Sequence, residues 1–296
     1  TMIAVYENDH CLYEKTIVLK EEMLDRDILS QIEVRKRSVL QTIHAIGLDM
    51  TNFAAVCGRG GLLRPIEGGT YLVNSKMIND LLSNQYGKHV SNLGAVLARS
   101  IAKEWNLDAF IVDPVVVDEM TGIAKKTGVP NIERKSIFHA LNQKSAGRIL
   151  AKQLNRKYKD LSLIIAHVGG GTTVGAHQYG RVIDVNNGFD GDGPFSFERS
   201  GSIPNHSLIQ LCCDSSLTKE NIEEKLISQS GLKAYLGLER QKDLDDLMQR
   251  NPEQVNSVFN ILAYQIAKEI GKMSTVLAGN VDAIILTGHL VKWEYL

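Results

Sequence analysis

The sequence predicts an α/β protein made of two related halves, each with a mixed sheet, that face a shared cleft. The main observation is segment 161–204, where a buried apolar strand is followed by three glycines and two alternating strands. A second observation is that strands of this kind alternate with helical stretches along the rest of the chain. The third is a weak internal repeat, because both halves order their strands and helices in a similar way.

The first half combines short strands with amphipathic helices. Its strands are predicted at 3–6, 11–19, 53–57 and 109–112. Its helices are predicted at 27–46, 75–84, 92–105 and from Ser136 to about Asn155. Gly47 is a typical stop for the first helix, and the hydroxyl of Ser136 is predicted to cap the last one.

The second half opens with the glycine-rich segment. Leu161 to Ala166 is an apolar run typical of a buried strand, and Gly169 to Gly171 follow it closely. No helix is expected next, because residues 172–185 alternate as two strands joined at Tyr179-Gly180. Glycine lacks a Cβ, so its N–H group can approach an anion closely, and the turn is a candidate anion site. The predicted elements that complete this half are helices at 218–228 and 252–271 and a strand at 283–286.

The repeat predicts an N-terminal domain at 1–155 and a C-terminal domain at 156–296. The first half lacks a counterpart of strand 161–166 and of the glycine turn, so both are expected to precede Thr1. The second domain is also expected to be incomplete at its end, because the strand at 283–286 has no covering helix. The apolar stripe of helix 252–271 suits either a core or an interface between copies.

Composition excludes several functional classes. An apolar content of 44% and a charged content of 23% are typical of a globular protein. A net charge of −1 argues against a nucleic-acid-binding surface. No apolar run approaches the ~20 residues that span a membrane. The four cysteines lack the paired spacing of a metal site, which predicts reduced, buried thiols and a cytoplasmic location.

The glycine turn fails the common nucleotide-binding signatures. Gly169 and Gly171 fit G-x-G-x-x-G, but Val174 stands at the third glycine position and no helix follows. The G-x-x-x-x-G-K-[ST] pattern of a P-loop does not occur. A calcium loop starting at Gly188 is rejected, because its first position is glycine and its twelfth is Arg199.

Four segments carry a resemblance to a known family. The segments His167–His177, Gly180–Asn187 and Asp190–Gly201, together with Gly58–Tyr71, are similar to the acetate kinase family and to its branch that phosphorylates butyrate. That family lies within the superfamily of sugar kinases, actin and heat-shock chaperones. The resemblance extends over essentially the whole chain. It implies two duplicated ribonuclease H-like (actin-like ATPase) domains with an interdomain cleft.

The same resemblance implies a reaction. ATP and Mg²⁺ would bind in the cleft, and the γ-phosphoryl group would pass reversibly to butyrate or a similar short-chain carboxylate, giving an acyl phosphate and ADP. One departure is Gly288-His289, where the family usually has two glycines in the adenosine turn. A homodimer or higher homo-oligomer is also implied.

Five residues are expected to carry the chemistry by this resemblance. Arg199 would stabilise the phosphoryl group in transit, with Arg59 contacting the carboxylate or the phosphoryl group. Asp113 would orient the substrate or bind Mg²⁺ as a metal ligand. His139 would lie beside the transferring phosphoryl group, and His167 would donate to the γ-phosphate. The residues expected to bind the nucleotide are His167, Gly169, Gly170, Gly171, Thr172 and Gly288.

Structural alternatives stand beside these roles. Arg199 could form an ion pair with Glu198 or Asp192, and Asp113 could cap the turn that follows it. His139 could simply be a packed helix histidine.

Alternative functions remain open as well. The chain could phosphorylate acetate, propionate or isobutyrate, or bind ATP without catalysis. A sugar kinase fits less well, because two arginines suit an anionic acceptor better than a hydroxyl.

Overall fold

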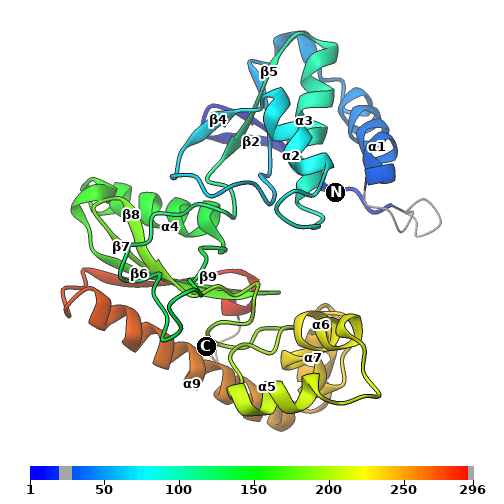
Figure 1. Ribbon diagram of the computed structural model, residues 1–296. Helices are drawn as coiled ribbons and strands as arrows, with labels where there is room; N and C mark the ends of the chain where they lie inside the picture. The colour runs from blue at the N-terminus through cyan, green and yellow to red at the C-terminus, as the bar shows by residue number, and fades with distance from the viewer. Residues whose placement is uncertain (20–28, 293–296) are drawn as a thin grey trace. The chain divides into compact units, whose positions relative to one another are not determined.

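The protein is described by a computed structural model that covers residues 1–19 and 29–292. It divides into two compact units, Thr1–Val116 and Val117–Leu296, whose elements are drawn in Figure 1. The domain division at residue 155 stays a prediction. Residues 117–155 nevertheless pack with the second unit, because Phe138 and Ala140 share a core cluster with Val182 and Val185.

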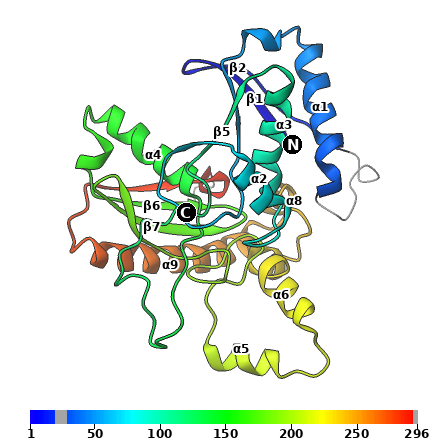
Figure 2. The ribbon, with the colours of Figure 1, turned by 45° about the horizontal axis from the view of Figure 1, so that its top comes forward.

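Within its described residues, 1–19 and 29–116, the first unit contains two small sheets and three α-helices. Its elements are β1 (Met2–Glu7), β2 (His10–Thr16), η2 (Leu29–Gln31), α1 (Ile32–Ala45), η3 (Met50–Asn52), β3 (Ala55–Gly58), β4 (Thr70–Leu72), α2 (Ser75–Leu82), α3 (Asn92–Glu104) and β5 (Asp108–Val112). Strands β1 and β2 form an antiparallel hairpin. The second sheet has the order β3-β5-β4, with β3 parallel and β4 antiparallel to β5. Figure 2 shows α1 and α3 side by side, and their contact buries Val39, Ile43 and Ile101.

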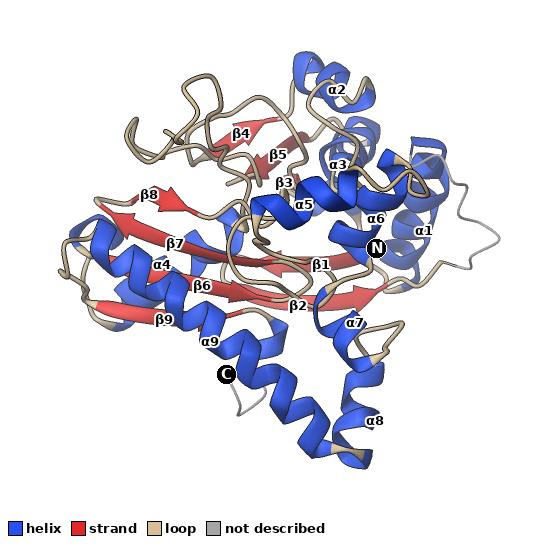
Figure 3. Cartoon of the chain, turned by 60° about the horizontal axis from the view of Figure 1, so that its bottom comes forward, coloured by secondary structure: helices blue, strands red, loops and turns tan. Residues whose placement is uncertain are grey.

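The second unit is built on a four-stranded mixed sheet. Its elements are α4 (Ala140–Gln153), η4 (Tyr158–Asp160), β6 (Leu163–Val168), β7 (Thr172–Gln178), β8 (Arg181–Val185), α5 (Asn205–Cys212), α6 (Lys219–Ser228), α7 (Gly231–Leu236), α8 (Asp243–Arg250), α9 (Pro252–Val276), β9 (Ala283–Thr287) and η5 (His289–Lys292). The strand order is β8-β7-β6-β9, as Figure 3 shows. Strand β6 is antiparallel to β7 and parallel to β9.

Successive side chains of β6 pack alternately against two helices, α9 on one face of the sheet and α4 on the other. Ile164, Ala166 and Val168 belong to the core cluster that α9 covers. Leu163 and Ile165 pack in a separate cluster with residues of α4. Because successive side chains of a strand point to opposite faces, His167 lies on the α4 face. The predicted apolar stripe of α9 is buried in the core, which settles its role within the unit.

The structure agrees with the predicted elements to within a few residues in most cases and differs in others. Ser136 does not cap a helix: its hydroxyl donates to the carbonyl of Val117 at 2.7 Å, and α4 begins only at Ala140. Residues 27 and 28 of the predicted first helix lie outside the described residues. Helices α5, α7 and α8 and strand β4 were not predicted.

The cysteines and the helices bear on two predictions made from composition. All four cysteines are free, as predicted, but they are exposed rather than buried. The prediction of burial was wrong, because Cys11 and Cys57 occupy exposed positions of short strands. Within residues 1–19 and 29–292, none of the helices has the length and apolar character needed to cross a membrane.

Candidate active site

The glycine turn joins β6 to β7 in the second unit and is surrounded by the tips of polar side chains. A Cβ placed on Gly169 would lie 2.9 Å from Cε1 of His289 and 3.2 Å from Nε2 of His167. A Cβ on Gly171 would lie 2.8 Å from Nη1 of Arg199 and 3.3 Å from Cε1 of His139. A side chain at either position would therefore displace the ends of these polar side chains.

Two predicted histidines meet beside this turn. His139 lies at the start of α4 and His167 lies near the end of β6. Their rings are stacked, with centroids 3.8 Å apart and an interplanar angle of 16°. The structure thus brings together two residues that the sequence separates by one strand and one helix.

Each imidazole is also held at one nitrogen. Nδ1 of His139 is 2.9 Å from Oγ1 of Thr173, and Nδ1 of His167 is 2.8 Å from Oδ1 of Asn142. Thr173 lies directly opposite His167 in the β6–β7 ladder, so both share the face that α4 covers. Sequence reasoning missed Thr173 and Asn142. Strand alternation could have found Thr173, and the helical spacing of three from His139 could have found Asn142.

Arg199 reaches the turn from the loop that follows β8. Its Nη1 donates to the carbonyl of Gly188 at 2.8 Å, and its guanidinium carbon lies 5.4 Å from the ring centroid of Phe189. Ser196 ties this loop to the turn, because its hydroxyl donates to the carbonyl of Gly170 at 2.6 Å and accepts from the Arg199 N–H at 3.2 Å. Arg199 is therefore positioned by both backbone and side-chain contacts.

Two buried polar atoms beside the turn lack a partner among the described residues. These are Nε of Arg199 and Oγ1 of Thr172. Buried polar groups are nearly always hydrogen-bonded, so an unpaired donor and hydroxyl at this place suit an external acceptor. Burial lowers the pKa of the Arg199 guanidinium, and the carboxylates of Glu198 and Asp190 act in the opposite direction.

Arg199 also borders a cavity of about 510 Å³ in the second unit. The walls come from the loop around Asp190 and from apolar residues of α5 and α6, among them Leu208 and Leu226. Asp192, one of the two predicted ion-pair partners of Arg199, instead accepts from Arg134 at 3.3 Å. The guanidinium therefore lies between the glycine turn and a space large enough for a ligand group.

Gly288 completes the set of predicted nucleotide-binding residues in the second unit. It follows β9 with a φ of 97°, and a Cβ there would lie 2.3 Å from the carbonyl oxygen of Val168. Because β9 runs parallel to β6, the ends of both strands lie at the same edge of the sheet. The neighbouring His289 reaches Gly169, a contact that the sequence did not predict.

Asp113, the predicted metal ligand, belongs to the first unit. It directly follows β5, is 1% exposed and adopts a left-handed φ of 38°. Its Oδ1 accepts from the N–H of Gly69 at 2.8 Å, and its own N–H donates to the Gly69 carbonyl at 2.9 Å. These hydrogen bonds tie Asp113 to the segment before β4. The structural alternative, a cap on the turn that follows Asp113, concerns a different segment and stays a prediction. Nearby, Arg64 forms an ion pair with Asp80 at 2.9 Å.

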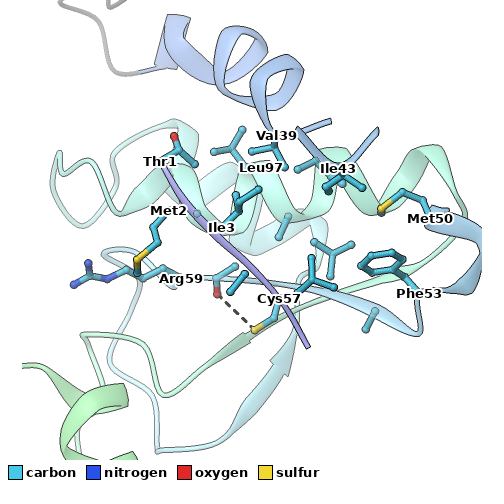
Figure 4. Close-up of a pocket in the computed structure, with 18 residues that line it drawn as sticks. Thr1, Met2, Ile3, Val39, Ile43, Met50, Phe53, Cys57, Arg59 and Leu97 are labelled. Atoms are coloured by element: carbon cyan, nitrogen blue, oxygen red, sulfur yellow. Dashed lines mark hydrogen bonds between the residues drawn. The ribbon is translucent and has the colours of Figure 1, made fainter. Parts of the chain in front are cut away.

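Arg59 lies at the edge of an apolar cavity of about 290 Å³ in the first unit. The cavity is lined by residues of β1, β3, α1 and α3. Figure 4 shows the guanidinium directed away from the apolar side chains, among them Ile3, Val39 and Ile43. The charged end of Arg59 is thus presented outside this cavity.

Among residues 1–19 and 29–292, no group of three or more His, Cys, Asp and Glu side chains is arranged to hold a metal ion. A Mg²⁺ ion bound to a nucleotide needs fewer protein ligands, because one or two carboxylates and the phosphates hold it. Glu198 offers a carboxylate near the turn, since its Oε1 would lie 3.8 Å from a Cβ on Gly170.

Comparison with known proteins agrees with the geometry. The chain matches the model of the acetokinase family over residues 122–291. It is 51% identical over 293 residues to the "Probable butyrate kinase" of Oceanobacillus iheyensis, which covers 98% of this chain and 82% of that protein.

Solved structures are similar at lower identity. An acetate kinase from Porphyromonas gingivalis matches with a TM-score of 0.69 at 18% identity, covering 84% of this chain and 67% of that one. A propionate kinase from Francisella tularensis subsp. tularensis matches with a TM-score of 0.65 at 20% identity, covering 88% and 68%. The predicted α/β fold of the actin-like ATPase type, with mixed sheets, is thereby confirmed.

Proposed function

This chain belongs to the acetokinase family, and we propose that it transfers the γ-phosphoryl group of ATP reversibly to butyrate or a similar short-chain fatty acid. The products are the acyl phosphate and ADP. The observation that carries the proposal is the cluster of His139, His167 and Arg199 around the glycine turn of the second unit. The relative named for butyrate supports this acid over acetate or propionate.

The chemistry explains why such a cluster is needed. A carboxylate is already ionised at neutral pH, so the reaction requires no strong general base. The difficulty lies in bringing two anions together and in stabilising the charge on the transferring phosphoryl group. Preorganised cations and N–H donors perform this task best in a site that excludes water.

The residues of the second unit divide this work. In this proposal the turn from Gly169 to Thr172 holds the nucleotide phosphates through its N–H groups, and the N–H of Gly169, which donates to the Gly171 carbonyl at 3.1 Å, instead shapes the turn. Gly288 allows the close approach of the adjoining strand end. Arg199 offers its fork to the equatorial oxygens of the phosphoryl group. His139 and His167 donate from the same side, because their rings are stacked.

The residues of the first unit act on the acceptor in this proposal. Arg59 contacts the carboxylate of the acid, and Asp113 orients Mg²⁺ or the substrate. One carboxylate oxygen of Asp113 accepts a hydrogen bond from the Gly69 N–H, which fixes the orientation of the carboxylate. Carboxylates such as Asp113 and Glu198 are the ligands that Mg²⁺ prefers. When bound, the ion neutralises charge on the phosphates. A cytoplasmic location and a homodimer or higher homo-oligomer are part of the same proposal.

Formation of an acyl hydroxamate tests the function directly. Natural full-length protein is incubated with ATP, MgCl₂, butyrate and hydroxylamine, and parallel reactions contain acetate, propionate or isobutyrate. The expected result is a product that depends on ATP and magnesium and is formed fastest with butyrate. Binding of ATP without product from any acid of two to five carbons would favour the second candidate, a non-catalytic nucleotide-binding protein.

A further inference from the structure

A continuous line of hydrogen bonds crosses the interior of the second unit and ends at His139. It begins at the Tyr158 hydroxyl, 2.6 Å from Nδ1 of His177, and continues from Nε2 of His177 to Oε1 of Gln143 at 3.0 Å. From there Nε2 of Gln143 is 3.0 Å from Oγ1 of Thr173, which is 2.9 Å from Nδ1 of His139. The three central residues are at most 1% exposed.

Strand alternation brings this line together. Thr173, Gly175 and His177 occupy every second position of β7 and face α4, which supplies Gln143. Gly175 makes the necessary room, because a Cβ there would lie 2.6 Å from Oε1 of Gln143. Position 175 is therefore a glycine because a larger residue would clash with the buried amide of Gln143.

The partners of Gln143 fix its orientation and the tautomer of His177. Nε2 of Gln143 donates to the Thr173 carbonyl at 2.9 Å, and a carbonyl can only accept. The amide oxygen must then face His177, so Nε2 of His177 carries a proton. Burial, together with the charge of Lys144, lowers the pKa of His177 to about 3, so the ring is neutral. Its Nδ1 therefore accepts from the Tyr158 hydroxyl.

The same reasoning extends to the hydroxyl of Thr173. This oxygen accepts from Nε2 of Gln143 at 3.0 Å and, more weakly, from the backbone N–H of His139 at 3.5 Å. A hydroxyl has two acceptor positions and one proton, so the Thr173 proton is left for Nδ1 of His139. A neutral imidazole that accepts at Nδ1 carries its own proton on Nε2.

We propose that Thr173 and Gln143, supported by His177 and Tyr158, are positioning residues that hold His139 as its Nε2–H tautomer. The stack on His167 sets the plane of the ring, and the Thr173 hydroxyl sets its rotation within that plane. His139 is thereby a donor from Nε2 toward the phosphoryl group. That last step rests on the proposed function, whereas the tautomer follows from the hydrogen bonds alone.

The tautomer is measured first, on natural full-length protein labelled with ¹⁵N-histidine. Long-range ¹H–¹⁵N spectra report which ring nitrogen carries the proton, and His139→Gln identifies the signals of His139 among the eight histidines. The expected result is a protonated Nε2 and an unprotonated Nδ1. A proton on Nδ1 of neutral His139 would overturn the proposal even in a fully active kinase, and it would leave the proposed function intact.

Variants of Thr173 then test the positioning role. Thr173→Val removes the hydroxyl at nearly constant volume, and Thr173→Ser retains it as the matched control. We expect Thr173→Val to lower kcat about 100-fold with little change in KM, since a misoriented or mis-tautomerised histidine loses most of its contribution. Thr173→Ser should stay within about 3-fold of the natural protein.

The spectra distinguish positioning from a general structural effect. In Thr173→Val the His139 signals should shift toward a mixture of tautomers, whereas Thr173→Ser should keep the natural pattern. Natural kcat and an unchanged tautomer in a folded Thr173→Val variant would contradict the proposal. If this variant does not fold, the tautomer of the natural protein still decides the question.

Discussion

The two glycine-rich turns of this chain look alike in sequence but serve different physical needs. In the first unit, a Cβ on Gly58 would lie 2.3 Å from the carbonyl oxygen of Gly94, and one on Gly60 would lie 2.5 Å from Cβ of Pro114. In the second unit, the nearest atoms to Gly169 and Gly171 are the tips of histidine and arginine side chains. Glycine therefore permits close packing of the chain in the first turn and access to polar groups in the second.

The difference identifies which turn is suited to bind an anion. Backbone and proline atoms fill the space beside Gly58 and Gly60, and they cannot move aside without shifting α3 or the segment after β5. The second turn instead faces flexible side-chain ends, and Arg199 leaves Nε without a partner among the described residues. A phosphate could replace such contacts at little structural cost.

The largest effect is expected for Arg199→Ala. Loss of the guanidinium removes the main cation beside the second turn, and arginines that stabilise transferring phosphoryl groups contribute about 10³-fold or more to turnover. Arg240→Ala is the matched control, because Arg240 is exposed and, among the described residues, pairs with Asp243 alone. Turnover is measured by hydroxamate formation. A decrease of only a few-fold in Arg199→Ala would remove this residue from the mechanism.

Asp113→Asn separates two roles that coexist in the first unit. Asparagine can still accept from the Gly69 N–H and tolerates the left-handed φ, so the free energy of unfolding should change by less than about 1 kcal/mol. If the charge orients Mg²⁺ or the substrate, kcat should fall about 100-fold. Urea denaturation and the kinase assay measure the two quantities. An unchanged kcat would assign Asp113 to the turn alone.

Alanine at one glycine of each turn tests the comparison itself. Gly171→Ala should displace the Arg199 guanidinium and lower kcat/KM about 10-fold, with a small change in stability. Gly60→Ala should instead lower the free energy of unfolding by about 1–3 kcal/mol, because its Cβ would overlap Pro114. The opposite pattern, a stability loss at Gly171 and none at Gly60, would contradict the distinction between the turns.

The last prediction concerns the dependence of stability on pH, which leaves activity near neutral pH unchanged. His177 has a pKa of about 3 in the folded protein, well below its ordinary value of 6.5. Below pH 6.5 the unfolded chain binds a proton that the folded chain excludes, so stability is lost as pH falls from 6.5 toward 3. The slope from this residue is at most about 1.4 kcal/mol per pH unit.

His177→Gln removes the contribution of His177 to the pH dependence of stability. It should flatten the dependence of the unfolding free energy on pH in this window, as measured by urea denaturation at several pH values. Lys144, paired with Glu119 at 2.8 Å, and Tyr158 are the neighbouring titratable groups, and they remain in the variant. An unchanged slope would show that His177 is protonated in the folded state.

Local sequence patterns were sufficient to predict part of the fold and of the candidate site. Alternation and an apolar run predicted β6, the glycine turn and β7, because these signals lie within a few residues. The meeting of His139 with Arg199 around Gly171 had no local signal, since one α-helix and three strands lie between them in the sequence. It was predicted only through the family resemblance. Ser136 was assigned to a cap because its alternative acceptor, the Val117 carbonyl, is distant in sequence.

The central claim is that the second turn holds the nucleotide phosphates. A crystal structure of natural full-length protein with a non-hydrolysable ATP analogue and Mg²⁺ tests it most directly. Phosphate oxygens are expected within hydrogen-bond distance of N–H groups in the turn from Gly169 to Thr172, with Arg199 and His139 beside the γ-phosphate. A bound analogue whose phosphates lie away from this turn would contradict it.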